Sequence, residues 1–353
     1  DGARGRVVVS PDASDLREYR TRRRDEQHER RQLHRLRREP TRTLDGVDIR
    51  LYANAESRDD VAEAHALGAA GLGLYRTEYL FLQGSAAPDE DTQFRAYRDA
   101  VLGMTGRTVT IRTLDLGADK ADRAGLTLPR EPNPALGCRG VRLSLARGDI
   151  FAIQMRALLR ASGYGPLRIL VPMVATRDEM LQVAALLRST REALRAEGHH
   201  VADEVPLGAM IEVPAAALAL PALADTVDFV SIGTNDLVQY MLAADRNNDA
   251  LEDLHSPLHP AVLRVLRDVI RTGRARGLPV AVCGEMAGDP AFVPLLLALG
   301  LEEFSLHPAT LLEVRRAIRA SDLGALRRRA GALMRARDRT GIERWMRQAT
   351  TAA

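Results

Sequence analysis

Two neighbouring segments decide the fold: Leu-Gly-Ala-Met-Ile-Glu-Val at 207–213 and Asp-Phe-Val-Ser-Ile-Gly at 228–233. Each is a short apolar run of strand length, and helical sequence separates the two. Short apolar strands that alternate with amphipathic helices are typical of parallel βα units. The same alternation continues toward both ends of the chain.

Similar runs recur from residue 45 onward. The expected strands lie near 47–53, 70–75, 108–113, 167–173, 207–213, 228–233, 279–283 and 303–306. Eight such strands predict an α/β fold, the (β/α)8 or TIM barrel, and 353 residues accommodate one barrel plus an appendage. The content of 46% hydrophobic but only 4% aromatic residues fits a core of layered Leu, Val and Ala.

The first 44 residues differ from the rest. Gly-Arg-Val-Val-Val-Ser at 5–10 predicts a short strand, and an arginine-rich helix follows from about Ser14 to Arg38, ended by Pro40. This helix has too few apolar residues to bury a full face, so we expect a solvated N-terminal linker helix. Acidic residues interrupt its basic ones, which argues against a nucleic-acid-binding arm. The barrel is expected to occupy 45–353.

Composition excludes several classes of protein. The 50 Lys and Arg nearly balance the 47 Asp and Glu, and a net charge of +3 gives no signal for nucleic-acid binding. Cys138 and Cys283 stand far apart in unlike contexts, which argues against a disulfide framework or a CxxC site. No stretch approaches the roughly 20 apolar residues of a membrane span, so we expect no membrane insertion and a cytoplasmic location. No nucleotide-binding glycine motif supports ATP handling.

Polar side chains follow several of the expected strands: Arg76, Arg112, Glu212, Asn235 with Asp236, and Cys283. The carboxyl ends of barrel strands form one rim, and active sites of this fold are built there. We therefore expect these five segments to converge at one mouth.

An arginine in an apolar run needs an anionic partner, because a desolvated unpaired charge is costly. For Arg76 or Arg112 alone, a salt bridge to Glu78 or Asp115 is as good an interpretation as ligand binding. The two arginines together favour a clamp for phosphate or carboxylate. Two further arginines could join them, Arg139 and Arg246.

Glu212 and Asp236 end neighbouring strands, and two carboxylates with open positions suit Mg²⁺. Asp236 could instead cap the following helix, and a metal-free acid/base pair is the other alternative. Cys283 follows an apolar strand, where a buried inert thiol is the usual interpretation; beside a cationic site it could act as a proton donor or nucleophile.

Seven segments carry a resemblance to a known family. They are Gly-Leu-Tyr-Arg-Thr-Glu-Tyr-Leu-Phe at 73–81, Arg-Thr-Leu-Asp-Leu-Gly-Ala-Asp-Lys at 112–120, Asn-Pro-Ala-Leu-Gly at 133–137, Glu-Val-Pro-Ala-Ala at 212–216, Ser-Ile-Gly-Thr-Asn-Asp-Leu at 231–237, Asp-Arg-Asn-Asn-Asp at 245–249 and Cys-Gly-Glu-Met-Ala-Gly-Asp at 283–289. In order and spacing the chain resembles the C-terminal half of Enzyme I of the phosphoenolpyruvate:sugar phosphotransferase system.

The resemblance implies a role for each matching residue. Arg76, Arg112 and Arg139 would hold the phosphate of phosphoenolpyruvate, Arg246 would add an anion contact, and Lys120 would lie near the site. Asn235 and the Asp236 backbone would receive the substrate carboxylate. Glu212 and Asp236 would bind Mg²⁺, and Cys283 would protonate the enolate as pyruvate forms.

The resemblance also implies partners. In the family, a histidine on a domain before the barrel accepts the phosphoryl group and passes it to the carrier HPr, and the barrels pair as homodimers. Residues 1–44 would then be the tail of that domain plus the linker helix.

Three alternatives stay open at this stage. One is the corresponding barrel of pyruvate phosphate dikinase or phosphoenolpyruvate synthase. Another is a Mg²⁺-dependent pyruvate aldolase or lyase that is active alone. The third is a dimerisation or regulatory module that keeps the ligand site as a sensor.

Overall fold

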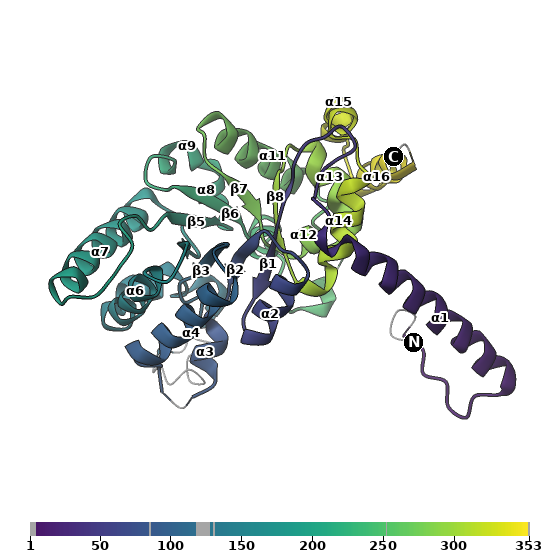
Figure 1. Ribbon diagram of the computed structural model, residues 1–353. Coiled ribbons are helices and arrows are strands. Elements are labelled where there is room, and N and C mark those ends of the chain that lie inside the picture. The colour runs from purple at the N-terminus through teal and green to yellow at the C-terminus, as the bar shows by residue number, and fades with distance from the viewer. Residues whose placement is uncertain (1–4, 85, 118–127, 130, 252, 352–353) are drawn as a thin grey trace.

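The protein is described by a computed structural model that covers residues 5–84, 86–117, 128–129, 131–251 and 253–351. Its centre is a closed barrel of eight parallel strands in chain order, in which the last strand pairs with the first (Figure 1). The strands are β1 (Arg50–Ala55), β2 (Gly71–Tyr75), β3 (Thr108–Arg112), β4 (Leu167–Val171), β5 (Leu207–Ile211), β6 (Phe229–Ile232), β7 (Val280–Val282) and β8 (Glu303–Leu306). The predicted (β/α)8 barrel is confirmed, with all eight strands expected from residue 45 onward in place.

Helices surround the barrel between successive strands. Those before β5 are α2 (Arg58–Ala66), α3 (Glu78–Leu82), α4 (Glu90–Gly103), α5 (Val141–Ala146), α6 (Gly148–Ser162) and α7 (Arg177–Ala196). Those between β5 and β8 are α8 (Pro214–Leu218), α9 (Leu220–Leu223), α10 (Thr234–Leu242), α11 (Pro260–Ala275), α12 (Glu285–Gly288) and α13 (Val293–Ala298). After β8 come α14 (Leu311–Arg319), α15 (Leu323–Met334) and α16 (Arg339–Thr351).

Local sequence fixes where several helices begin. The Ser57 hydroxyl accepts the Asp60 amide at the start of α2, and the Asp60 carboxylate accepts the Ser57 amide in return. Thr176 and Glu179 make the same reciprocal pair at the start of α7. These capping boxes satisfy amide groups that a first helical turn otherwise leaves unpaired.

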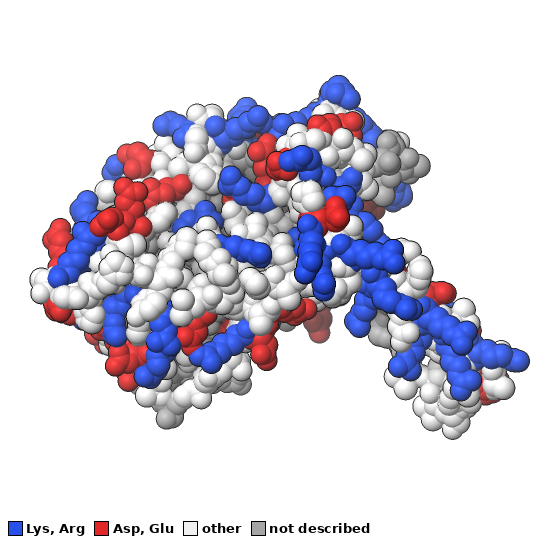
Figure 2. All heavy atoms as spheres, in the orientation of Figure 1, with Lys and Arg blue, Asp and Glu red and all other residues white. Residues whose placement is uncertain are grey.

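The linker helix α1 (Ala13–Arg35) projects away from the barrel (Figure 1) and carries a band of basic side chains along its length (Figure 2). Among its described residues only Leu33 is buried. A short 3₁₀ turn, η2 (Leu36–Arg38), joins it to the barrel ahead of Pro40. The predicted solvated linker helix is confirmed.

The strand predicted at residues 5–10 is wrong. This segment forms no strand, and the side chains of Val7 and Val9 are almost fully exposed. A strand needs a neighbouring strand to satisfy its backbone groups, and a closed barrel offers no free edge. The β-branched run therefore has high strand propensity but no strand among the described residues to pair with.

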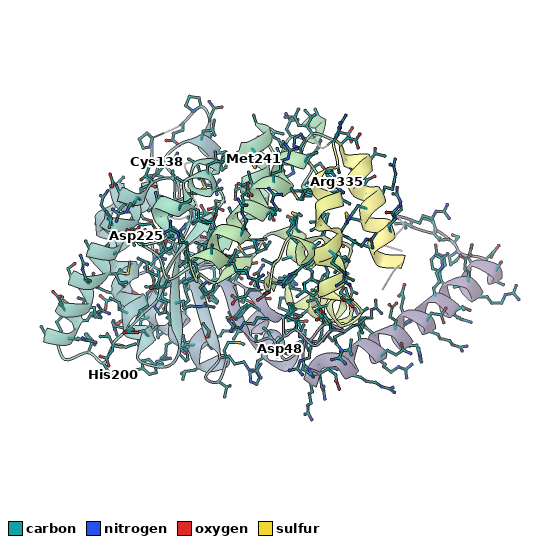
Figure 3. All side chains as sticks on the ribbon, turned by 90° about the horizontal axis from the view of Figure 1, so that it is seen from above. Asp48, Cys138, His200, Asp225, Met241 and Arg335 are labelled. Carbon is teal, nitrogen blue, oxygen red and sulfur yellow. The ribbon has the colours of Figure 1, made fainter. Side chains whose placement is uncertain are left out.

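The two ends of the barrel are built from different segments. Figure 3 shows Cys138, which follows β3, and Met241 of α10 at one end, and it shows Asp48 and His200, which precede strands, at the other. The first end holds the carboxyl ends of the strands, where the site lies. Across the described residues, no helix has the length and apolar character needed to cross a membrane.

Candidate functional site

A cavity of about 750 Å³ opens at the carboxyl ends of the strands. Its lining includes every described residue that the sequence predicted for the site: Arg76, Arg112, Arg139, Glu212, Asn235, Asp236, Arg246 and Cys283. The expected convergence at one mouth is therefore confirmed as geometry. Lys120, also predicted to lie near the site, falls outside the described residues.

Arginines and carboxylates alternate around this mouth. Arg112 at the end of β3 lies 3.1 Å from a Glu78 oxygen and 3.0 Å from an Asp115 oxygen. Asp115 in turn lies 3.1 Å from Arg139. Glu78 also accepts the backbone amide of Asp115 at 2.7 Å, which fixes the loop after β3. Buried charges are tolerated in this way because each one has an opposite charge beside it.

These contacts shift the titration of the buried members. Burial by itself disfavours the charged form of Arg112, but Glu78 and Asp115 outweigh it and raise the pKa of its guanidinium. Burial likewise opposes ionisation of Asp115, yet Arg112 and Arg139 hold its pKa below the usual value. Both groups are therefore charged at neutral pH, and Asp115 orients two arginines at once.

The ion pairs of the mouth are longer around Asp236 than around Asp115. Arg139 lies 3.6 Å from one Asp236 oxygen, and Arg246 lies 3.8 Å from the other. Both distances exceed the usual length of a hydrogen bond. The buried Oδ1 of Asp236 has no hydrogen-bond partner among the described residues. One oxygen of a buried carboxylate thus remains free to bind a ligand at the mouth.

Glu212 lies at the end of β5 and is 1% exposed. One of its oxygens accepts the Met173 amide at 2.7 Å. Burial, together with the charges of Asp115 and Asp236, raises the pKa of Glu212 to about 8. Gly233 keeps space beside it, since a Cβ there would stand 2.6 Å from the second Glu212 oxygen. Burial and the two neighbouring carboxylates therefore disfavour the ionised form of Glu212.

Cys283 follows β7 and lies in a small apolar cluster with Leu74 and Met210. Its Sγ approaches the Ile232 carbonyl oxygen at 3.5 Å. Burial raises the pKa of this thiol above its ordinary value. The sulfur therefore keeps its proton at neutral pH, which suits a proton donor and does not suit a thiolate nucleophile.

Arg76 and Asn235 have different surroundings. Arg76 is about half exposed and its contact with Glu56 spans 3.8 Å, so its guanidinium remains available. The Asn235 amide nitrogen donates to the Glu285 carboxylate at 2.9 Å, and its oxygen accepts the Glu285 amide at 3.0 Å. Asn235 therefore enters the mouth in an orientation that the start of α12 fixes.

Sequence reasoning missed His255, which lines the mouth and whose buried Nε2 has no hydrogen-bond partner among the described residues. It also missed Tyr240 of α10, which supports the mouth from behind its lining: its hydroxyl donates to the Ala135 carbonyl, and its oxygen lies 3.5 Å from Arg139. Neither residue follows a strand directly, so the strand-end pattern could not identify them.

Comparison with known proteins gives a consistent result. The family described as "PEP-utilising enzyme, PEP-binding domain" matches residues 30–323. The phosphoenolpyruvate-protein phosphotransferase of Cupriavidus necator is 50% identical over 320 residues, which are 90% of this chain and 55% of that protein. The protein of the same name from Geobacillus stearothermophilus is 47% identical over 315 residues, 89% of this chain and 54% of that protein. The chain spans about half the length of these curated relatives.

Among solved structures, a citrate lyase from Burkholderia xenovorans aligns over 87% of this chain and 92% of its own, with 16% identity and a TM-score of 0.48. Similarity at that level adds nothing about the chemistry of the mouth.

Proposed function

The chain belongs to the PEP-utilising enzymes, as their PEP-binding domain, and from that premise we propose that its mouth binds phosphoenolpyruvate as half of a phosphoenolpyruvate-protein phosphotransferase. The observation that carries the proposal is the mouth itself, where Arg76, Arg139 and Arg246 line one cavity together with an Asp236 oxygen that has no hydrogen-bond partner among the described residues. Phosphoenolpyruvate carries a phosphate and a carboxylate, and guanidinium groups bind both through charge-assisted hydrogen bonds.

The arginines fall into two groups by their surroundings. Arg112 already contacts two carboxylates, so it holds a fixed positive charge at the floor of the mouth. Arg76 and Arg246 are partly exposed and loosely paired, so they can reorient toward a phosphate. In this proposal Arg112 and Arg139 position the phosphate and the outer two close over it.

We propose Mg²⁺ as the cofactor, held by Glu212 and Asp236. The fit rests on the unpartnered Asp236 oxygen, the space that the missing side chain of Gly233 leaves beside Glu212, and the oxygen chemistry of two neighbouring carboxylates. Mg²⁺ accepts one or two carboxylates and completes its shell with water and substrate oxygens. When bound, it would supply positive charge that stabilises the departing enolate.

The reaction proceeds through this chain's own residues in a defined order. The arginines hold the phosphoryl group in line with an incoming histidine nitrogen. A nitrogen–phosphorus bond forms, the bond from phosphorus to the enol oxygen breaks, and that oxygen keeps the electron pair. The protonated thiol of Cys283 then gives its proton to the terminal carbon, which yields pyruvate, and the thiol regains a proton from solvent.

The accepting histidine is proposed to lie on a segment upstream of the barrel, with HPr as the next acceptor in sugar uptake in the cytoplasm. Residues 1–44 would comprise the tail of that segment and the linker, and residues 45–353 the barrel, paired as a homodimer. The projection of α1 away from the barrel supports this arrangement, since a polar helix with one buried residue can stand in solvent as a connection to an upstream segment.

Calorimetric titration with phosphoenolpyruvate tests the proposal, first with Mg²⁺ and then with EDTA, while pyruvate release is assayed in the same samples. We expect binding that depends on Mg²⁺ and no sustained pyruvate formation by residues 1–353, because the acceptor is proposed to lie on the upstream segment. Addition of a histidine-bearing segment from a relative should start turnover.

Two results would overturn the proposal. Pyruvate turnover by the chain alone would identify an aldolase or lyase, and absence of binding under both conditions would leave a structural module. A matched variant, Cys283→Ala, should bind phosphoenolpyruvate as the parent does and lose turnover in the reconstituted system.

A further inference from the structure

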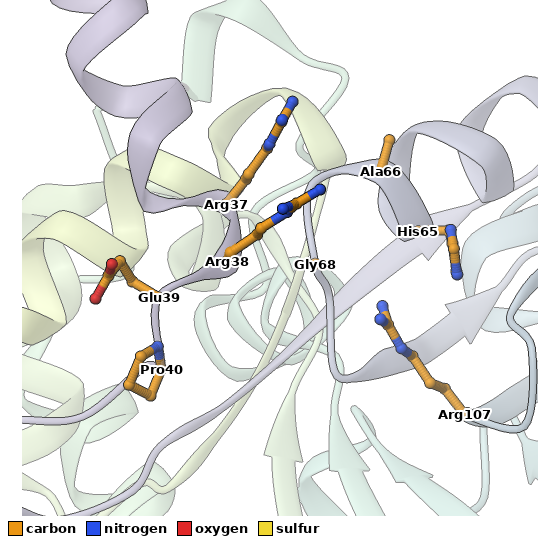
Figure 4. Close-up of a pocket in the computed structure, with 8 residues that line it drawn as sticks. All are labelled: Arg37, Arg38, Glu39, Pro40, His65, Ala66, Gly68 and Arg107. Atoms are coloured by element: carbon orange, nitrogen blue, oxygen red, sulfur yellow. The ribbon is translucent and has the colours of Figure 1, made fainter.

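A second cavity of about 730 Å³ lies where the linker meets the barrel. It is lined by Arg37, Arg38, Glu39, Pro40, His65, Ala66, Gly68 and Arg107 (Figure 4). Gly68 and Arg107 come shortly before β2 and β3, so this cavity lies at the opposite end of the barrel from the mouth. Its volume is in the range of small-molecule sites.

The lining is strongly basic. Three arginines face one carboxylate, that of Glu39, and Glu39 lies 3.5 Å from Arg319. Figure 4 shows the Arg38 and Arg107 guanidiniums extending into the space beside Gly68, with His65 nearby and the Glu39 carboxylate directed away. The cavity therefore presents positive charge that the described side chains leave uncompensated.

The donors of this cavity are largely unused. Arg107 donates one N–H to the Ala69 carbonyl at 2.8 Å, which anchors its guanidinium and leaves four other N–H groups. Arg37 has a single long contact of 3.4 Å with the His34 ring. Within the described part of the chain, the Arg38 guanidinium makes no hydrogen bond or ion pair. The arginines of the mouth differ, because each has a carboxylate within 4 Å.

A buried arginine behind the cavity adds to its charge. Arg315 is 2% exposed and donates only to neutral acceptors: the Thr41 hydroxyl and the carbonyls of Leu36, Leu67 and Gly68. No carboxylate among the described residues pairs with it. A desolvated cation without a counter-ion raises the electrostatic potential of the nearby cavity, because little solvent screens it.

Gly68 gives the cavity its shape. Its φ of +72° lies in the left-handed region, and a Cβ there would stand 2.2 Å from the Arg37 carbonyl oxygen. The turn before β2 can therefore pass directly against η2. This contact brings two arginines of the linker beside a histidine and an arginine of the barrel.

We propose that this cavity binds a small phosphate-bearing anion, with Arg37 and Arg38 contributed by the linker and His65 and Arg107 by the barrel. Multiple guanidiniums without carboxylate partners favour a polyvalent anion over a monovalent one. A bound anion would connect the linker to the barrel at a site separate from the mouth. Such an anion would bind whether or not the mouth holds phosphoenolpyruvate.

Inorganic pyrophosphate is the probe, titrated at constant ionic strength into the chain carrying ¹⁵N-glycine. The Gly68 amide reports on this cavity and the Gly233 amide on the mouth. The test variant is Arg38→Gln/Arg107→Gln. The matched control, Arg188→Gln/Arg264→Gln, makes the same change of charge at exposed positions on α7 and α11.

We expect a saturable shift of the Gly68 signal in the parent chain and the control. In the test variant the affinity read at Gly68 should fall at least about tenfold, or ~1.4 kcal/mol, while the Gly233 response stays unchanged. An unresponsive Gly68 signal, or an equal loss of affinity in the control, would overturn the proposal. Phosphoenolpyruvate binding read at Gly233 tests the mouth separately.

Discussion

Arg112 and Arg76 stand at the ends of neighbouring strands and differ in what surrounds them. Arg112 is buried between Glu78 and Asp115, whereas Arg76 is about half exposed and 3.8 Å from Glu56. Sequence alone gave both arginines equal chances of structural and ligand-binding roles. In the structure Arg112 contacts two carboxylates. Arg76 has only one loose contact and is the more available of the two for a ligand.

This difference predicts distinct effects of truncation. Arg112→Ala should lower the free energy of unfolding by roughly 3 kcal/mol, because two buried carboxylates lose a counter-charge, and should also weaken phosphoenolpyruvate binding. Arg76→Ala should weaken binding but change stability by less than about 0.5 kcal/mol. Urea denaturation and calorimetry measure the two effects. Equal stability losses would contradict the assignment.

The raised pKa of Glu212 predicts that the free energy of unfolding depends on pH when no metal is bound. Its pKa is about 8 in the folded chain against an ordinary 4.5. The folded state therefore binds the proton more tightly, so the stabilisation is complete below about pH 4.5 and is lost as pH rises to about 8. The loss should be on the order of 5 kcal/mol.

Urea denaturation across this range in EDTA measures the loss, and Glu212→Gln serves as the comparison. The variant keeps an oxygen to accept the Met173 amide but cannot ionise, so its stability should lack this component. Added Mg²⁺ should reduce the loss in the parent chain. Identical pH profiles for the two proteins would show that Glu212 titrates normally.

At the scale of elements, the junction of η2 with the turn before β2 depends on close backbone approach. Gly68 and Gly277 have similar φ values, +72° and +69°. A Cβ at 68 would collide with the Arg37 carbonyl, whereas at 277 nothing lies within 4 Å. The two positions therefore separate backbone strain from collision.

Gly277→Ala should cost only the left-handed strain, roughly 1 kcal/mol. Gly68→Ala should cost that amount plus the displacement of η2, giving a total of about 3 kcal/mol. Chemical denaturation of both variants provides the measurement. If the two substitutions cost the same, η2 does not depend on this contact.

The elements also show what the sequence could and could not predict. Strand positions followed from apolar runs, and the mouth followed because Arg112, Glu212 and Asp236 end such runs. The strand prediction for residues 5–10 was wrong, because the strand propensity of a segment does not reveal whether a partner strand exists. The Arg315 contacts join residues some 250 to 280 positions apart, and no local pattern carries that information.

On the scale of the whole molecule, closure of β8 onto β1 leaves no free strand edge. The helices after β8 pack onto the same core, and Trp345 of α16, the single tryptophan of the chain, is buried there. Its Nε1 donates to the Arg329 carbonyl at 3.1 Å. The barrel and its C-terminal helices therefore share one hydrophobic core.

This shared core predicts cooperative unfolding. Guanidinium titrations followed by Trp345 fluorescence and by far-ultraviolet circular dichroism should give coincident transitions. Phosphoenolpyruvate with Mg²⁺ at about 100 times its Kd should raise both free energies of unfolding by ~2.7 kcal/mol. If only the circular dichroism transition responds, α16 unfolds independently of the barrel.

The four hydrogen bonds of Arg315 also define where the chain can be shortened. A fragment that starts at Pro40 loses the Leu36 carbonyl and the buried Leu33 side chain, and it leaves a buried cation short of an acceptor. A fragment that starts near residue 28 retains both. The smallest stable piece of this protein therefore includes the last turns of α1, even though most of that helix contributes nothing to the core.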